Sequence, residues 1–340
     1  MRGKIIRLIL LFALISGQYG KAQDPHFSQF FASPLTLNPA LTGKFDGLVR
    51  VAGNYRNQWP TIFNAFTTGT ISADFNILHK KISPVDQFGV GIMGMYDVNG
   101  AGIMKNNYLN ASIAYHKGLD EAGYHQLGVG LSTSFAQRTL NTEKLVFEDQ
   151  LTTIGFTGTT AEVIAASPAI NLNYFGLNAG LLYTGSTNEY NQFYFGAALY
   201  HINRPEKSFA GNLFQARERY TLHGGGYFSV ASKTSLFLSG NFQLQNAATE
   251  MIAGAALGWM INDREDAPTD VYAGGWYRLG DAVIPYVGLE NKGFRVGLSY
   301  DINVSGLSLA SRRQGGFELS LIYIQPNRDG KKAEWRCPRF

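Results

Sequence analysis

The stretch from Phe294 to Ile302 reads FRVGLSYDI and alternates without a break between two kinds of residue. Its even-numbered residues are all apolar, whereas its odd-numbered residues, such as Arg295 and Asp301, are polar or small. Successive side chains of a β-strand point to opposite faces, so this pattern predicts a strand with one apolar face and one polar face. The same alternation recurs along the chain, and no apolar run is long enough to span a bilayer as a helix, which needs about 20 residues.

The chain begins with the features of a secretion signal. Basic residues precede an apolar core at residues 8–15, and Gly20 and Ala22 are small residues at the two positions that a signal peptidase reads. We therefore expect residues 1–22 to be a signal peptide that is cleaved before Gln23. Export combined with alternating strands favours a closed antiparallel β-barrel in the outer membrane of a Gram-negative bacterium, because every backbone polar group in lipid must be paired.

The charge balance excludes nucleic acid as a partner. Residues 1–22 hold four of the 29 Lys and Arg residues and none of the 25 Asp and Glu residues, which leaves 25 of each in the mature chain. A formal net charge of zero gives no basis for binding nucleic acid. Only 16% of the residues are charged, against roughly 25% in a typical soluble domain. The 39 Gly, 23 Phe and 18 Tyr residues are typical of a lipid-facing barrel.

The alternation predicts an all-β fold of about fourteen transmembrane strands. The predicted strands are 47–56, 65–77, 87–97, 106–116, 124–137, 170–184, 191–202, 218–230, 233–246, 249–261, 270–279, 282–290, 293–302 and 315–325. An even number is expected of a single-chain barrel with both termini in the periplasm. The longer connections, 138–167 and 203–217, follow the fifth and seventh predicted strands and are therefore expected on the external side.

The chain divides into four predicted parts around a single barrel domain. They are a signal peptide (1–22), an N-terminal plug or cap segment (23–45), the barrel (46–326) and a periplasmic tail (327–340). Within the barrel, Leu238 belongs to a parity that should meet lipid. The residues expected to face the lumen are Arg50, Asn54, Arg56, Asn241, Gln243, Arg295 and Asp301.

Motifs that would carry chemistry are not found in the sequence. Gly89, Gly91 and Gly94 match the spacing of a dinucleotide fingerprint, but a strand and a turn follow them where that motif requires a helix. We interpret them as strand glycines between large lipid-facing residues. The six histidines have no metal-ligand spacing. We accordingly expect no catalytic residue, no metal and no cofactor, and a protein that is not an enzyme.

The segment from Asp24 to Gly43, DPHFSQFFASPLTLNPALTG, is explained neither by a strand nor by a free tail. Pro25, Pro34 and Pro39 prevent a continuous helix or a central strand, while its phenylalanines and leucines are too apolar to remain solvated. The segment must therefore pack against something. A lumenal plug or a periplasmic cap is favoured over a pure partner-docking arm, and both roles are compatible if a partner displaces the plug.

Two motifs in this segment, D-P-x-F-S-Q and N-P-A-x-x-G, resemble the start of the mature PorP/SprF family of outer-membrane proteins of type IX secretion and gliding motility. The likeness continues in order to the final CPRF and covers essentially the whole mature chain, with residues 139–166 the least similar. It implies a non-enzymatic barrel that works with periplasmic ring or motor proteins, or that escorts a surface adhesin by its C-terminal domain. The candidate plug or partner-binding residues are Asp24, Pro25, Phe27, Ser28, Gln29, Asn38, Pro39, Gly43, His201, Arg204, Pro205, Trp335, Cys337, Pro338, Arg339 and Phe340.

Two classes of function therefore remain open from the sequence. The favoured class is a secretion or adhesin-anchoring component that binds a partner chain and performs no bond chemistry. The alternative is a barrel for passive uptake of small solutes or hydrophobic substrates, in which the polar lumen residues would line the path.

Overall fold

The computed structural model describes residues 24–62, 66–77, 85–188, 190–209, 212–262 and 269–325. The expected signal peptide (1–22), with its cleavage before Gln23, lies outside the described residues. So does the expected tail (327–340), which contains the candidates Trp335, Cys337, Pro338, Arg339 and Phe340. None of the helices in these described ranges is long and apolar enough to cross a membrane.

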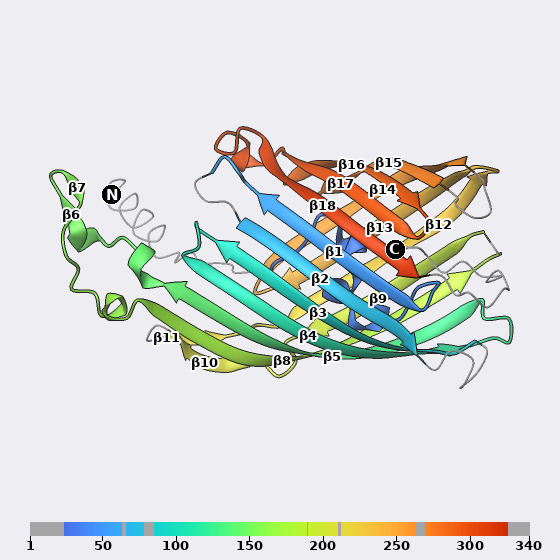
Figure 1. The fold of residues 1–340 in the computed structure, drawn as a ribbon, viewed down its shortest axis with the longest axis horizontal. Helices are drawn as coiled ribbons and strands as arrows, with labels where there is room; N and C mark the ends of the chain where they lie inside the picture. The colour runs from blue at the N-terminus through green and yellow to red at the C-terminus, as the bar shows by residue number, and fades with distance from the viewer. Residues whose placement is uncertain are drawn as a thin grey trace, which may run out of the picture.

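In the described part of the chain, fourteen antiparallel strands close into one barrel (Figure 1). They are β1 (Val49–Gln58), β2 (Phe66–Ile77), β3 (Gln87–Asn99), β4 (Met104–Gly118), β5 (His125–Asn141), β8 (Ala169–Ser186), β9 (Gln192–Tyr200), β12 (Arg219–Ala231), β13 (Thr234–Gln245), β14 (Ala248–Asn262), β15 (Thr269–Arg278), β16 (Ala282–Asn291), β17 (Phe294–Asn303) and β18 (Gln314–Gln325). The first strand pairs with both β2 and β18, which closes the wall. The predicted fourteen-strand barrel is confirmed, and the largest difference is the end of β5, at Asn141 where residue 137 was predicted.

The two faces of the strands follow the predicted alternation. Leu238 is 41% exposed on the outer face of β13, whereas Asn241 is 3% exposed on its inner face. Ordinary period-two geometry is sufficient to explain this arrangement, since a chain that meets lipid on one side must bury its polar side chains on the other. The sequence pattern therefore identifies which residues of these strands line the lumen.

The barrel has two unlike ends. The long connections 142–168 and 201–218 follow β5 and β9 and lie at one end, here called the loop end, which is the end expected to be external. The short connections 119–124 and 292–293 lie at the other end, here called the turn end. Outward aromatic side chains form a girdle near the loop end, as expected at a membrane interface. Its members are Tyr55, Tyr96, Phe135, Phe175, Tyr220, Tyr277, Tyr300 and Phe317.

The segment before β1 fills the lumen, and it is the dark-blue chain inside the barrel in Figure 1. It contains three short helical turns, η1 (Phe30–Ala32), α2 (Pro34–Leu37) and η2 (Pro39–Leu41). The prolines at the first positions of α2 and η2 fit because a helix leaves those backbone N–H groups without an internal partner. Phe31 packs against Trp276 and Tyr286 of the wall, with ring centroids 4.8 and 5.5 Å apart. Residues 24–45 are called the plug from here on.

The plug crosses the lumen from the loop end to the turn end. Asp24 contacts residues that follow β9 and begin β12, whereas Gly43 contacts Gly89 near the start of β3 at the turn end. The sequence analysis expected both termini on the periplasmic side, whereas in the described residues Asp24 lies at the loop end and Gln325, the end of β18, lies at the turn end. The first strand does start at the turn end, but the chain reaches it from the loop end because the partners of Asp24 lie there.

Short helices and strands lie in the connections at the loop end. The connection after β5 contains η3 (Thr142–Lys144), η4 (Glu148–Gln150), β6 (Leu151–Thr152), β7 (Gly155–Phe156) and η5 (Val163–Ala166). The connection after β9 forms a hairpin of β10 (Glu206–Phe209) and β11 (Asn212–Gln215), and η6 (Gly306–Ser308) follows β17. In Figure 1 the β6–β7 hairpin stands well away from the barrel, beyond the ends of β5 and β8.

Candidate functional site

Four groups of contacts, here called anchors, hold the plug to the barrel wall. The first anchor is at Asp24, whose Oδ2 lies 3.0 Å from His201 Nε2 and 3.7 Å from Arg219 Nη1. Its backbone N–H donates to Gln245 Oε1 at 2.7 Å. Burial alone would raise the pKa of the Asp24 carboxyl, but His201, Arg219 and Gln245 together hold that pKa well below its usual value. The start of the plug is thus fixed as a charged group at the loop end.

The second anchor is the Ser-Gln pair of the D-P-x-F-S-Q motif. The backbone N–H groups of Ser28 and Gln29 donate to the two oxygens of Glu318, at 2.5 and 2.8 Å. The Ser28 hydroxyl donates to Asp301 at 2.9 Å, and the Gln29 amide donates to Ser299 at 3.0 Å. One turn of the plug therefore satisfies carboxylates on β17 and β18 that are buried away from water.

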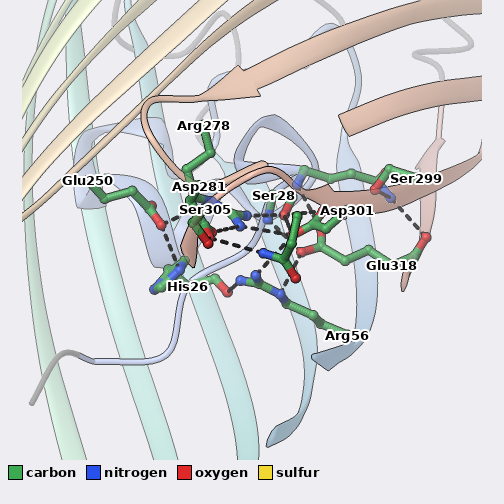
Figure 2. A network of polar contacts seen from close by, with 12 residues as sticks. His26, Ser28, Arg56, Glu250, Arg278, Asp281, Ser299, Asp301, Ser305 and Glu318 are labelled. Atoms are coloured by element: carbon green, nitrogen blue, oxygen red, sulfur yellow. Dashed lines mark hydrogen bonds and ion pairs between the residues drawn. The ribbon is translucent and has the colours of Figure 1, made fainter. Parts of the chain in front are cut away.

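A network of charges surrounds this second anchor (Figure 2). Arg56 Nη2 lies 3.2 Å from Asp301, and Arg56 Nε lies 3.1 Å from Glu318. Arg278 lies 2.9 Å from Asp301 and 3.3 Å from Glu250. Buried charges are costly unless they are paired, and removing one partner from such a network is strongly destabilising. The plug is a member of this network, since its N–H groups supply donors that the two guanidiniums do not.

His26 extends the same network from the plug to β14. Its Nε2 lies 2.7 Å from Glu250 Oε2. Among the described residues, no group of three or more His, Cys, Asp or Glu residues could hold a metal ion. His26 and Arg278 thus share Glu250, which links the plug to β14 and β15.

The third anchor is Asn38, which begins the N-P-A-x-x-G motif. Its Nδ2 donates to the carbonyls of Leu181 and Ala197 at 3.0 and 3.3 Å, and lies 2.9 Å from His223 Nε2. Its Oδ1 accepts from the backbone N–H of Ala40 at 2.8 Å and thereby caps η2. An asparagine suits this position because its amide supplies donors to the wall and an acceptor to its own turn.

The fourth anchor closes the plug at the turn end. Gly43 adopts a φ of 70°, which favours glycine, and its N–H donates to Asp74 Oδ2 at 2.8 Å. Arg50 pairs with the same oxygen at 2.8 Å and donates to the Leu41 carbonyl at 3.0 Å. Both Arg50 and Asp74 are 1% exposed. The last turn of the plug is therefore connected to the first two strands of the barrel.

Glycines of the wall make room for the plug backbone. A Cβ at Gly130 would lie 2.3 Å from the backbone N of Ala40, and one at Gly89 would lie 2.3 Å from the Thr42 carbonyl oxygen. A Cβ at Gly180 would lie 1.9 Å from Asn38 Oδ1. These distances are far below a non-bonded contact, so a side chain at Gly130 or Gly89 would displace the plug backbone, and one at Gly180 would displace the Asn38 side chain.

Two small cavities lie between plug and wall in the described ranges. An apolar cavity of about 30 Å³ adjoins β8 and β9, and a more polar one of about 10 Å³ lies near the start of the plug. A single water needs about 10–15 Å³ of such space, so neither cavity is a solute path. The apolar cavity is lined by Phe31, Pro34, Leu37, Leu41, Lys44, Leu182, Thr184 and Tyr194.

The structure brings some of the candidate residues together and leaves others apart. Those in contact within the plug anchors are Asp24, Ser28, Gln29, Asn38, Gly43 and His201, and Pro25, Phe27 and Pro39 lie in the plug between them. Arg204 and Pro205 lie instead in the connection after β9, where Arg204 pairs with Glu218. The residues expected to face the lumen, Arg50, Asn54, Arg56, Asn241, Gln243, Arg295 and Asp301, all point inward, and Gln243 is half-buried beside the polar cavity.

The wall partners of the plug were missed by sequence reasoning. Glu318, Asp74, Glu250 and His223 lie on lumen-facing positions, but nothing in the alternation says which residue of the plug each one meets. Ser28 and Glu318, for example, are 290 positions apart. The available signal was the presence of acidic residues on the inner parity of strands, which indicates a buried partner without naming it.

Comparisons with known proteins agree with this architecture. The family model described as "Type IX secretion system membrane protein PorP/SprF" matches residues 19–323. No curated protein matches the sequence. Among solved structures, the Ralstonia pickettii toluene transporter TbuX is similar with a TM-score of 0.52 and 10% identity, over 90% of this chain and 95% of that one. The Pseudomonas putida toluene transporter TodX matches with a TM-score of 0.46 and 9% identity, over 89% and 94%. At this identity TbuX shows the outer-membrane barrel fold alone.

Proposed function

The chain belongs to the PorP/SprF family of type IX secretion membrane proteins, and we propose that it serves there as a binding component with a closed lumen. It holds a partner polypeptide by its rims and loops and performs no bond chemistry. The partners that the family suggests are periplasmic ring or motor proteins of the secretion machinery, or the C-terminal domain of a surface adhesin.

The observation that carries this proposal is the anchored plug. It spans the lumen from Asp24 at the loop end to Gly43 at the turn end, and buried polar contacts hold it at both positions. Each buried hydrogen bond that loses a partner costs about 1–3 kcal/mol, so several contacts must be given up together before the lumen opens. A partner protein bound at a rim requires no such opening.

Exposed apolar side chains at the loop end support a binding role. Ile154 in the β6–β7 hairpin is 83% exposed, and Leu213 in the β10–β11 hairpin is 74% exposed. Both lie in connections beyond the strands, so lipid does not account for them. Val146, Leu151 and Phe156 are also exposed in the connection that contains Ile154, and a group of exposed apolar residues outside the membrane is typical of a surface that contacts other proteins.

Deletion of residues 25–41 behind an intact signal tests the proposal. We expect the barrel to insert in the outer membrane and to run as a heat-modifiable band, while cargo secretion or adhesin display falls to the level of a strain lacking the gene. Permeability to small solutes should rise, because the lumen loses its filling. Wild-type secretion together with unchanged permeability would show that the plug has neither role.

The second candidate function, uptake of small apolar solutes, is favoured by the apolar cavity beside Leu182 and Tyr194. Under this reading the plug would shift to let a solute pass. A pull-down of the tagged barrel from detergent extract separates the two candidates. Recovery of secretion-machinery proteins or an adhesin supports the binding role, whereas a barrel recovered alone, with solute uptake that depends on it, supports transport.

A further inference from the structure

The long connection after β9 leaves and re-enters the barrel wall beside the same residue of the plug. His201, its first residue, lies 3.0 Å from the Asp24 carboxylate, and Arg219, the first residue of β12, lies 3.7 Å from the same oxygen. Gln245 of β13 accepts from the Asp24 N–H at 2.7 Å and donates to the carbonyl of Arg217 at 3.2 Å. Both ends of the connection are therefore tied to the start of the plug.

A second plug residue, Thr36, is held by the same two ends. Its carbonyl accepts from the Tyr200 hydroxyl at 3.0 Å and from Arg219 Nη2 at 3.1 Å. Tyr200 is the last residue of β9, and the guanidinium of Arg219 lies over its ring, 3.9 Å from the centroid. The plug thus bonds to the residues that flank the connection at two separate positions along its own chain.

The backbone conformation of His201 depends on its neighbours. Its φ is 57°, in the left-handed region that residues other than glycine rarely adopt. Its N–H donates to Asn178 Oδ1 at 3.0 Å, and its ring contacts Asp24 and lies edge-on to the ring of Tyr174. A strained conformation persists only where the surrounding contacts hold it. Loss of the Asp24 contact would therefore free the chain at the point where the connection starts.

Beyond these ends, the β10–β11 hairpin packs against lumen-facing side chains of the wall, beside the end of β8 in Figure 1. The rings of Phe214 and Tyr174 are 5.6 Å apart, and the guanidinium of Arg138 lies 4.7 Å from the Phe214 centroid. Ala216 is 6% exposed in the same cluster, and its N–H donates to the Pro205 carbonyl at 3.1 Å. Because Tyr174 contacts both the hairpin and His201, the hairpin adjoins the first anchor of the plug.

The other long connection at the loop end has no such link. Within the described residues, the hydrogen bonds of residues 142–168 go to one another, to Ala101 and to the end of β8, and none goes to the plug. A change in the plug should therefore reach the β10–β11 hairpin and leave this connection unaffected.

We propose that the seated plug fixes the position of the β10–β11 hairpin, so that unseating the start of the plug releases the hairpin from the wall. The hairpin then signals at the loop end whether the lumen is filled. Because coupling between two sites is reciprocal, a ligand that pulls the hairpin off the wall also loosens the plug. This inference goes beyond the proposed function, since the coupling is a property of the barrel without a bound partner.

The experiment measures whether the buried position 216 becomes accessible when the plug is loosened. Ala216→Cys is introduced into the full-length protein together with Cys337→Ser, which removes the single native thiol. The rate of maleimide labelling is measured on the purified barrel in detergent, with and without Asp24→Ala, after heat-modifiable migration has verified folding. Loss of a buried hydrogen-bond partner shifts an equilibrium by about tenfold or more, so labelling should become about tenfold faster in Asp24→Ala.

Two control positions separate release of the hairpin from general loosening. Leu213→Cys, at a position that is 74% exposed, should label at the same fast rate with and without Asp24→Ala. Thr142→Cys, at a position that is 3% exposed in the connection 142–168, should remain slow in both. Unchanged labelling at position 216 in Asp24→Ala would overturn the proposal, and so would an equal rise at positions 142 and 216.

Phe214→Ala tests the coupling from the other side and serves where Asp24→Ala fails to fold. It removes the ring that packs on Tyr174 and changes no residue that bonds to the plug. Hydrogen–deuterium exchange at the start of the plug should become faster in Phe214→Ala and not in Leu213→Ala, which changes an exposed neighbour. Equal exchange in the two variants would contradict the coupling. Neither readout involves secretion, so a failure of the proposed function remains distinguishable from a failure of this inference.

Discussion

Replacing Gly130 by alanine tests whether the plug is seated as tightly as the wall glycines imply. The new Cβ would lie 2.3 Å from the backbone N of Ala40 and 2.4 Å from the carbonyl carbon of Pro39, whereas ordinary contacts begin near 3.4 Å. All of these atoms belong to the plug backbone, so the plug must move by roughly 1 Å or the strand must bend. A shift of this size would stretch the bonds that Asn38 makes to the wall at 3.0 and 3.3 Å.

Overpacking of this kind costs about 1–3 kcal/mol. Since about 1.4 kcal/mol corresponds to a tenfold change in an equilibrium constant, the unseated fraction of the plug should rise about 5- to 140-fold. Hydrogen–deuterium exchange on the purified barrel measures this directly, because peptides from residues 24–45 should exchange faster by the same factor while strand peptides do not.

The matched control is Gly94→Ala, on the outward side of β3. A Cβ there meets nothing closer than 3.9 Å, so the substitution should leave exchange in the plug unchanged. Equal exchange in residues 24–45 for the Gly130 and Gly94 variants would refute the tight seating of the plug. If Gly130→Ala prevented the barrel from folding, the result would show that the barrel does not fold unless the plug is seated.

Two further predictions concern lipid exposure and pH. Leu238→Arg places a charge on the lipid-facing surface and should cost about 2–4 kcal/mol near the midplane, whereas Gln243→Arg beside the polar cavity should cost less. Folding yields into lipid vesicles measure both, and equal yields would mean that the faces are wrongly assigned. Because the pKa of Asp24 is lowered on folding, its anchor contributes stability above the unfolded pKa, about 3.9, and loses it as pH falls through the folded value. Asp24→Asn should therefore raise exchange in the plug at neutral pH, with a difference from wild type that shrinks as the pH is lowered below about 4; a difference independent of pH would contradict this.

The strands and their faces could be predicted because lipid imposes a period of two on each strand. The strand from Phe193 onward shows where that signal fails. It is apolar on both parities, and only the structure separates Phe195, 63% exposed to lipid, from Tyr194, 4% exposed against the plug. An apolar plug inside the lumen removes the contrast between the two faces on which the sequence pattern depends.

The contacts of the plug could not be predicted for a different reason. Periodicity assigns a face, but it gives no distance between residues far apart in sequence, so the pairing of Ser28 with Glu318 leaves no trace in the alternation. The glycines of β3 were correctly placed on a strand from the context of the motif. Position 89 needs a glycine, however, because the backbone of Thr42 lies against it, and only the structure with the plug in place shows this contact.

The second anchor also joins the first strand of the barrel to the last two strands. Arg56 lies on β1, while Asp301 and Glu318 lie on β17 and β18, and Ser28 of the plug bonds to both carboxylates. These strands meet at the seam where the first strand closes against the last. The guanidiniums of Arg56 and Arg278 pair with these buried carboxylates, and the plug N–H groups supply the further hydrogen bonds that the carboxylates of Glu318 need. Closure of the barrel and seating of the plug are therefore coupled, because each supplies partners that the other needs.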